Sequence, residues 1–192
     1  MHTTLISYIQ SHASTPLTDL EIAVLKEIFI PRKYLKGQFL LQHGDVCKNY
    51  AFLCKGATHK FVVNEKGTEN IVALSIENWW VGDRDSYFRE IPTIYNIQAY
   101  EDCDTLLFSK KDYPRLQEIP AFVEMRLKLD ENHAIANERN KLLLIGYSAE
   151  KRYENFLKMH PELVRRFPLW IIASYLGITK ETLSRIRRHT NI

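Results

Sequence analysis

Residues 169–188 of this chain read LWIIASYLGITKETLSRIRR. The apolar positions of this stretch fall where two short crossing helices would share a small core, and they are Ile172, Leu176, Ile178, Leu183 and Ile186. Ala173 is small where the second helix would cross the first, and Gly177 falls in the turn, where a positive φ costs glycine nothing. Pro168 suits the first turn of the first helix. The stretch therefore predicts a helix-turn-helix.

The second helix of this pair presents a charged face. Thr179 can cap the helix by accepting a backbone N–H. The side chains that could reach DNA are Thr179, Lys180, Glu181, Ser184, Arg185, Arg187 and Arg188. Arg185 can donate to O6 and N7 of guanine, and Glu181 can accept from N4 of cytosine, while the other side chains can reach phosphates or bases. A helical hairpin with a solvated charged face is the plainer interpretation, but the agreement of so many positions with the pattern favours a helix that reads the major groove of DNA.

The charge of the chain is unevenly distributed. Residues 151–192 contain nine Lys or Arg and three Asp or Glu, so this segment carries +6 and the remainder −3, which gives the net charge of +3. A basic end suits a nucleic-acid partner, because neutralising phosphates supplies most of the non-specific binding energy. Solvated surface is the other interpretation of a basic end, so the charge only supports the prediction of DNA binding.

The N-terminal segment has the periodicity of helices. Apolar residues recur at spacings of three and four from Thr3 to about Phe29. Pro16 divides this segment, and Thr18 or Asp19 can cap the second helix.

From about residue 31 to residue 111 the pattern changes to short β-rich runs separated by glycine and other turn residues. The runs are Gln38–Leu41, Tyr50–Leu53, His59–Val63, Asn70–Ser75, Tyr95–Ala99 and Thr105–Ser109. So many short strands at nearly regular spacing predict a sandwich or a jelly-roll barrel, also described as a double-stranded β-helix. With its flanking helices, the chain is expected to be an α+β protein.

A long helix is predicted from about Ala121 to Leu144, and a shorter one from Ala149 to Met159. On the long helix, one stripe at alternating spacings of three and four contains Phe122, Met125, Leu129, His133, Ala136, Asn140 and Leu143. This stripe is similar to the seam of a coiled coil, so we expect a homodimer formed through the helix at residues 121–146. A helix packed on its own domain is the alternative interpretation.

Composition disfavours several classes of protein. No apolar run approaches the ~20 residues that cross a bilayer, and the N-terminus lacks the features of a signal peptide, so we expect a cytoplasmic protein with no membrane partner. Cys47, Cys54 and Cys103 fit neither a disulfide framework nor a structural zinc set, and we expect buried or half-buried thiols. The predicted barrel holds only His43 and His59, which disfavours a cupin-like metalloenzyme. No catalytic motif is apparent, so the chain is not expected to be an enzyme.

With these features the chain resembles the CRP/FNR family of bacterial transcription regulators. The run Gly177-Ile-Thr-Lys-Glu-Thr-Leu-Ser-Arg-Ile is similar to the recognition-helix motif of that family, and the glycines at positions 37, 44, 56, 67 and 82 follow its β-roll pattern. The resemblance implies a cyclic nucleotide-binding-like sensor domain at residues 1–120, a dimerisation helix at 121–146 and a helix-turn-helix DNA-binding domain at 147–192. It also gives Glu181 and Arg185 the main base-reading roles at a roughly palindromic site.

The resemblance also implies an effector pocket, and there the chain departs from the family pattern. Members that bind cyclic AMP hold it with a Gly-Glu pair and, further along, an Arg-Ser pair, where this chain has Gly-Asp and Thr-Ile. The candidate pocket residues are Gly82, Asp83, Thr93, Ile94, Tyr95 and Asn137. A cyclic phosphate needs a compensating cation or a nest of N–H groups, so tight binding of cyclic AMP is not expected, and no other cofactor is assigned.

Two further features of the family are missing. The chain ends at Ile192, so no β-hairpin wing is expected after the recognition helix, and the four-cysteine iron–sulfur signature of the oxygen-sensing branch is absent. The missing wing keeps one alternative open, an effector-binding or interaction protein that has lost DNA binding. The main prediction is a homodimeric DNA-binding regulator with an altered effector pocket, with RNA polymerase as a candidate further partner.

Overall fold

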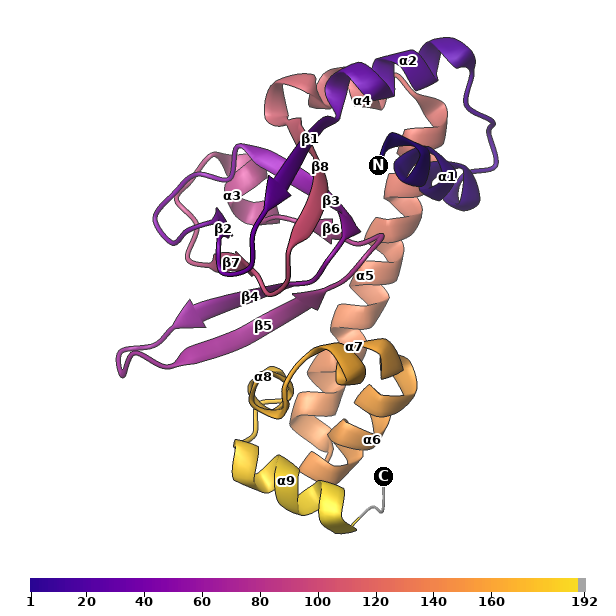
Figure 1. The fold of residues 1–192 in the computed structure, drawn as a ribbon. Helices are drawn as coiled ribbons and strands as arrows, with labels where there is room; N and C mark the ends of the chain where they lie inside the picture. The colour runs from indigo at the N-terminus through magenta and orange to yellow at the C-terminus, as the bar shows by residue number, and fades with distance from the viewer. Residues whose placement is uncertain (190–192) are drawn as a thin grey trace. The chain divides into compact units, whose positions relative to one another are not determined.

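The computed structural model describes residues 1–189, which form two compact units (Figure 1). The first unit contains Met1–Lys60 and Ser75–Asn132, and the second contains Phe61–Leu74 and the chain from His133 onward. One hairpin and one long helix therefore contribute residues to both units.

Helices occupy both ends of the first unit's sequence. Thr18 begins the second of them with a capping box, because its hydroxyl accepts from the N–H of Glu21 and the Glu21 carboxylate accepts from the N–H of Thr18 at 2.8 Å. Of the two predicted caps, Thr18 is therefore confirmed. The helical elements are α1 (His2–His12), α2 (Asp19–Ile28), α3 (Arg84–Arg89), the 3₁₀ turn η1 (Lys110–Asp112), α4 (Tyr113–Gln117) and the first part of α5 (Pro120–Gly146).

Eight strands form two four-stranded sheets. They are β1 (Ile30–Tyr34), β2 (Phe39–Leu41), β3 (Asn49–Lys55), β4 (Thr58–Val63), β5 (Glu69–Ser75), β6 (Trp80–Val81), β7 (Asn96–Ala99) and β8 (Cys103–Ser109). One sheet has the order β1-β8-β3-β6, and the other has the order β2-β7-β4-β5. Each strand predicted from the sequence is present, which confirms the α+β class with a jelly-roll type of sandwich.

Two strands were not indicated by the sequence pattern. β1 contains Pro31, yet it pairs along its whole length with β8, so that Ile30 lies opposite Leu107 and Tyr34 lies opposite Cys103. The sheet tolerates a proline there because β1 is an edge strand, where a missing backbone N–H breaks no internal ladder. β6 has only two residues, which are too few to show a period.

Two apolar clusters hold the first unit together. Alternating residues of each strand point to opposite faces of the sheet. The residues that face the space between the sheets are Tyr34, Ala51, Leu53, Val81, Ile97, Ala99 and Cys103. The intervening residues of β3 and β8 pack against the helices in a larger cluster that includes Phe29, Phe52, Leu106, Phe108 and Phe122.

The second unit is built mainly from helices. They are the end of α5, α6 (Ala149–Met159), α7 (Pro161–Arg166), α8 (Leu169–Tyr175) and α9 (Lys180–His189). α6 has the predicted bounds and is capped by Ser148, whose hydroxyl accepts from the N–H of Lys151. Buried side chains from α6 to α9, among them Tyr153, Phe156, Leu163 and Leu183, form its core.

The predicted coiled-coil seam on α5 is wrong for the first half of the helix. Phe122 and Met125 are 3% and 1% exposed, because they pack in the core of their own unit beside the aromatic side chains of the sheet. A side chain buried in this way cannot pack against a second subunit. After Met125, the large apolar side chains that α5 exposes are Leu127, Ile135, Leu142, Leu144 and Ile145.

Candidate functional site

The turn between α8 and α9 has the geometry that the sequence predicts. Gly177 has a φ of +66°, in the left-handed region that favours glycine, and its N–H donates to the carbonyl of Ser174 at 3.0 Å. The hydroxyl of Thr179 then accepts from the N–H of Thr182 at 3.2 Å, which confirms the predicted cap of α9. Pro168 is one position off its prediction, since it immediately precedes the first residue of α8.

The packing of this helix pair also agrees with the sequence pattern. Ile172, Ala173, Leu176, Leu183 and Ile186 are buried, as predicted. The small Ala173 is 1% exposed, which is consistent with a close approach of the two helices. Of the predicted core residues, Ile178 alone is only half-buried.

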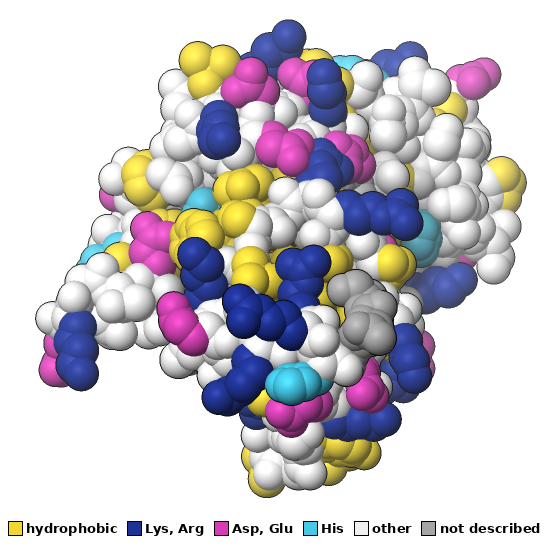
Figure 2. Space-filling view, turned by 60° about the horizontal axis from the view of Figure 1, so that its bottom comes forward, with side chains coloured by type: hydrophobic (Ala, Val, Ile, Leu, Met, Phe, Trp, Pro, Cys, Tyr) yellow, Lys and Arg dark blue, Asp and Glu magenta, His cyan; other side chains and the backbone are white. Residues whose placement is uncertain are grey.

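The outer face of α9 is polar and predominantly basic. Lys180, Glu181, Arg185, Arg187 and Arg188 are exposed, with Thr179 exposed just before them and Ser184 half-buried among them. Lys and Arg side chains gather at this end of the second unit in Figure 2. Among residues 1–189, no carboxylate forms a salt bridge with Lys180, Arg187 or Arg188. Their charges are therefore available to phosphate oxygens.

α8 is held by a contact that sequence reasoning missed. The hydroxyl of Ser174 accepts from the N–H of Ile71 at 3.0 Å and donates to the carbonyl of Glu69 at 3.2 Å. Both partners lie on β5, more than 100 residues away in the sequence. No local pattern indicates a partner at such a separation.

A second candidate site lies in the first unit, around Asp83. The Asp83 side chain is buried and accepts from the hydroxyl of Thr93 at 2.6 Å. Lys60 lies on its other side, with Nζ 3.6 Å from Oδ1 of Asp83 and 3.8 Å from the ring centroid of Tyr95. Burial lowers the pKa of Lys60, and the adjacent Asp83 carboxylate counteracts this effect by favouring the charged ammonium.

The structure brings together four of the six predicted pocket residues, namely Gly82, Asp83, Thr93 and Tyr95. Ile94 is 60% exposed and points to solvent, and Asn137 is an exposed residue of α5 that belongs to the second unit. Lys60 was missed because it lies on β4, far in sequence from the Gly-Asp pair.

Gly82 has a structural reason to be glycine. A Cβ at this position would lie 2.7 Å from the ring of Tyr50. A side chain at this position would therefore require the Tyr50 ring to move, whether or not a ligand binds nearby.

Ion pairs connect the first residue of α3 to α5 within the first unit. Arg84 donates to Oδ1 of Asp130, and Arg126 donates to Oδ2 of the same carboxylate at 3.0 Å. The Asp130 carboxylate on α5 thus binds Arg84, which directly follows Asp83. This contact holds α3 and α5 together.

The cysteines are free thiols, with Cys47 and Cys103 buried and Cys54 half-buried, as expected. Within residues 1–189, no cluster of three His, Cys, Asp or Glu side chains could hold a metal ion. In the same range, no helix combines the length and the apolar character that crossing a membrane requires.

Comparisons with known proteins find bacterial regulatory proteins among the relatives. Residues 31–118 match the cyclic nucleotide-binding domain family. The regulatory protein HlyX of Actinobacillus pleuropneumoniae is 24% identical over 186 residues, which cover 88% of this chain and 75% of HlyX. The fumarate and nitrate reduction regulatory protein of Vibrio cholerae is 25% identical over 186 residues, covering 88% of this chain and 72% of that protein.

A solved structure shares the fold. A CooA variant from Carboxydothermus hydrogenoformans superposes with a TM-score of 0.72 at 20% identity, over 88% of this chain and 78% of that one. The likeness covers the β-sandwich, the long helix and the C-terminal helices.

Proposed function

We propose that this chain is a transcription regulator of the CRP/FNR type and that it binds specific DNA as a homodimer through α9. The observation that carries the proposal is the exposed basic face of α9 behind a glycine turn of the helix-turn-helix kind. A bacterial regulator that binds chromosomal DNA works in the cytoplasm. Contact with RNA polymerase remains a prediction of the family resemblance.

Within this proposal the residues of α9 have different roles. Glu181 is exposed in the first turn of α9 and Arg185 is exposed one turn later, and in a helix that enters the major groove they read cytosine and guanine. Lys180, Arg187 and Arg188 neutralise phosphates and set the register of the helix. A homodimer would place two such helices about 34 Å apart, one turn of DNA, on a roughly palindromic site.

We also propose that the sensor does not hold cyclic AMP tightly. Asp83 is already paired with Lys60 and accepts from Thr93, so a ribose hydroxyl would have to compete with these partners for the carboxylate. Lys60 is committed to that carboxylate, and a cyclic phosphate that drew it away would leave Asp83 buried without its partner.

The test begins with selection of a binding site from a random duplex library, followed by fluorescence anisotropy on the selected duplex and on a scrambled one. Arg185→Ala should weaken binding to the selected duplex by roughly 10- to 100-fold and relax its sequence preference. Arg188→Ala should weaken binding to both duplexes alike and reduce the salt dependence. Lys158→Ala, on α6, serves as the control for lost charge alone.

Two results would count against the proposal. The assignment of α9 is wrong if Arg185→Ala retains both the affinity and the sequence preference of the unaltered protein. A chain that shows no salt-dependent DNA affinity at all would instead be an effector-binding or interaction protein.

A further inference from the structure

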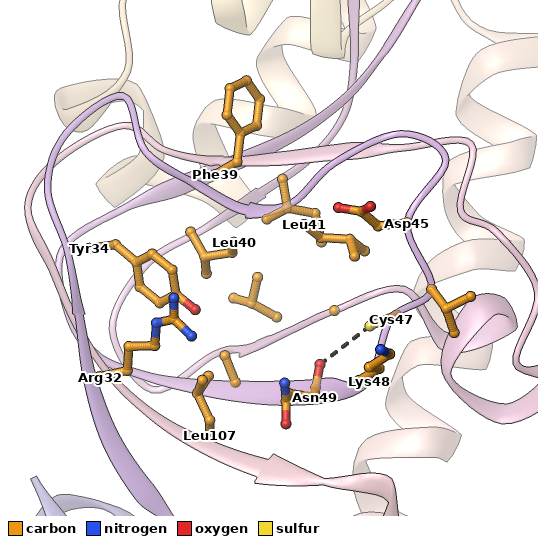
Figure 3. A pocket seen from close by; sticks show the side chains of 15 residues that line it. Arg32, Tyr34, Phe39, Leu40, Leu41, Asp45, Cys47, Lys48, Asn49 and Leu107 are labelled. Carbon is orange, nitrogen blue, oxygen red and sulfur yellow. Dashed lines mark hydrogen bonds between the residues drawn. The ribbon is translucent and has the colours of Figure 1, made fainter.

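The first unit contains a cavity of about 310 Å³ between its two sheets, with Arg32 and Tyr34 at one end (Figure 3). Within residues 1–189, every residue that lines this cavity belongs to the first unit, and none lies on β4, β5 or the helices from α6 to α9. The contact that bears on the recognition helix is a different one. It joins β5 to α8, and the residues that form it all belong to the second unit.

β5 is the outer strand of its sheet, so half of its backbone groups face away from the neighbouring strand β4. The N–H of Asn64 donates to the carbonyl of Thr68 at 3.0 Å, which marks the first pair of the hairpin. Backbone groups alternate in direction along a strand, so Thr68 and Asn70 face β4 whereas Glu69 and Ile71 face outward. The carbonyl of Glu69 and the N–H of Ile71 therefore need a partner from outside the hairpin.

The side chain of Ser174 supplies that partner, in the way that a further strand would. Its hydroxyl accepts from the N–H of Ile71 at 3.0 Å and donates to the carbonyl of Glu69 at 3.2 Å. A hydroxyl has one donor and two acceptor sites, so a single serine can bind both groups at once. Ile71 is 5% exposed, and its N–H would be costly to leave without a partner. Figure 1 shows β5 and α8 beside each other at this contact.

The backbone of Ser174 binds the turn that leads to α9. Ser174 is the last residue but one of α8, and its carbonyl accepts from the N–H of Gly177 at 3.0 Å. The N–H of Ile178 donates to the carbonyl of Ala173, also at 3.0 Å, and α9 begins at Lys180. One residue therefore holds β5 with its side chain and the turn before the recognition helix with its backbone.

This contact leaves the charged face of α9 exposed. Lys180, Glu181 and Arg185 are all exposed while Ser174 is bound to β5. The face of α8 that carries Ser174 is covered instead, since Ile171, three residues earlier on the same face, is 0% exposed. A contact that covered α9 would compete with DNA, whereas this one is compatible with DNA binding.

We propose that Ser174 is a positioning residue for DNA binding, whose hydroxyl joins α8 to β5 and so holds α9 in the orientation that enters the major groove. Without this hydroxyl the helix pair can turn relative to β5, and only a fraction of the molecules presents α9 correctly. The affinity for DNA falls by that fraction. The hydroxyl is bound to β5 and reads no base, so the sequence preference does not depend on it. This inference rests on the proposed DNA binding through α9.

The first measurement is amide hydrogen exchange of the full chain without DNA, on the variants Ser174→Thr and Ser174→Val. Threonine and valine are both β-branched and nearly equal in shape, so the two variants differ in the hydroxyl alone. The amide of Ile71 should stay protected in Ser174→Thr and should exchange roughly tenfold faster or more in Ser174→Val. The amide of Asn70, which faces β4, should exchange alike in both. Equal exchange of Ile71 in the two variants would overturn the contact itself.

The second measurement is fluorescence anisotropy of the same variants on the selected and the scrambled duplex. Ser174→Thr should bind like the unaltered chain, and Ser174→Val should bind both duplexes roughly 3- to 10-fold more weakly. The ratio of the two affinities and the salt dependence should not change, because no base or phosphate contact is lost. If a branched residue disturbs α8, Ser174→Ala, which removes only the hydroxyl, replaces Ser174→Val in both measurements.

Two outcomes of the binding experiment have different meanings. If Ser174→Val binds DNA like Ser174→Thr although its Ile71 amide exchanges faster, the positioning role is wrong and the proposed function stands. If the unaltered chain binds neither duplex, the proposed function fails, and the positioning role fails with it.

Discussion

Lys60 and Asp83 form an ion pair inside the first unit, with side chains only 19% and 7% exposed and with Nζ 3.6 Å from Oδ1. The acid of this pair is Asp83, which the family resemblance places in the effector pocket. The ammonium of Lys60, on β4, therefore binds the Asp83 carboxylate from within the protein. In a nucleotide-binding relative, the ligand would bind the corresponding acid.

Removing one partner of this pair should be costly. Lys60→Met leaves the buried carboxylate of Asp83 with only Thr93, so the free energy of unfolding should fall by about 3 kcal/mol. Lys33→Met breaks an exposed pair, whose lysine is 78% exposed, and should cost less than about 1 kcal/mol. Urea denaturation of both variants measures the difference, and equal small losses would show that the Lys60 pair is not effectively buried.

His59 should make the fold sensitive to acid. It is 4% exposed, and burial lowers its pKa from 6.5 to about 4. The unfolded chain therefore binds the proton more readily than the folded chain, so the stability is full above pH 6.5 and is lost as the pH falls toward 4. Between about pH 7 and about pH 5 this one group should cost roughly 1 to 2 kcal/mol.

Denaturation curves at several pH values check this expectation. His59→Phe should flatten the pH dependence, because a phenyl ring has no proton to gain. His43→Gln, a change at an exposed histidine, should leave the pH dependence as it is. A pH profile of His59→Phe that matches the unaltered chain would assign the acid sensitivity to other groups.

Gly177 and Gly146, both in the second unit, should respond in opposite ways to alanine. At Gly177 a Cβ has room, with Leu144 as its nearest neighbour at 4.0 Å, but the φ of +66° strains any other residue, so Gly177→Ala should destabilise the unit by about 1 kcal/mol. Gly146 ends α5 with nothing within 4 Å of a Cβ, and Gly146→Ala should be neutral or stabilising by up to about 1 kcal/mol. Thermal unfolding compares the two variants, and equal melting temperatures would contradict the strain argument.

The exposed part of α5 should carry the proposed dimer contact. Ile135 and Leu142 are 50% and 59% exposed, and their spacing of seven residues places them on one face of the helix. Glutamate at both positions should convert a dimer to a monomer in sedimentation velocity, because the charges would lose their hydration in the interface. Asn137→Glu, two residues after Ile135 and so on the other side of the helix, should leave the dimer intact. A double variant that remains dimeric would place the contact elsewhere.

The second unit was predictable because its signals are local. The turn glycine, the helix cap and the regularly spaced apolar residues all lie between Leu169 and Arg188. Each of these signals depends on residues only a few positions apart. The strands of the sandwich were predicted for the same reason, with β1 and β6 missed because a proline and a length of two residues hide the pattern.

The sequence by itself determined the helix-turn-helix, the order of helices and strands and the resemblance to CRP/FNR regulators, since these follow from the spacing of neighbouring residues. Only the tertiary structure decided that Phe122 and Met125 lie in a core, that Lys60 occupies the site at Asp83 and that Arg32 faces a cavity. These three facts depend on which strands and helices meet. Contacts between strands and helices are set by the burial and the hydrogen-bond pairing of residues far apart in the chain. A single sequence carries no local signal for such contacts.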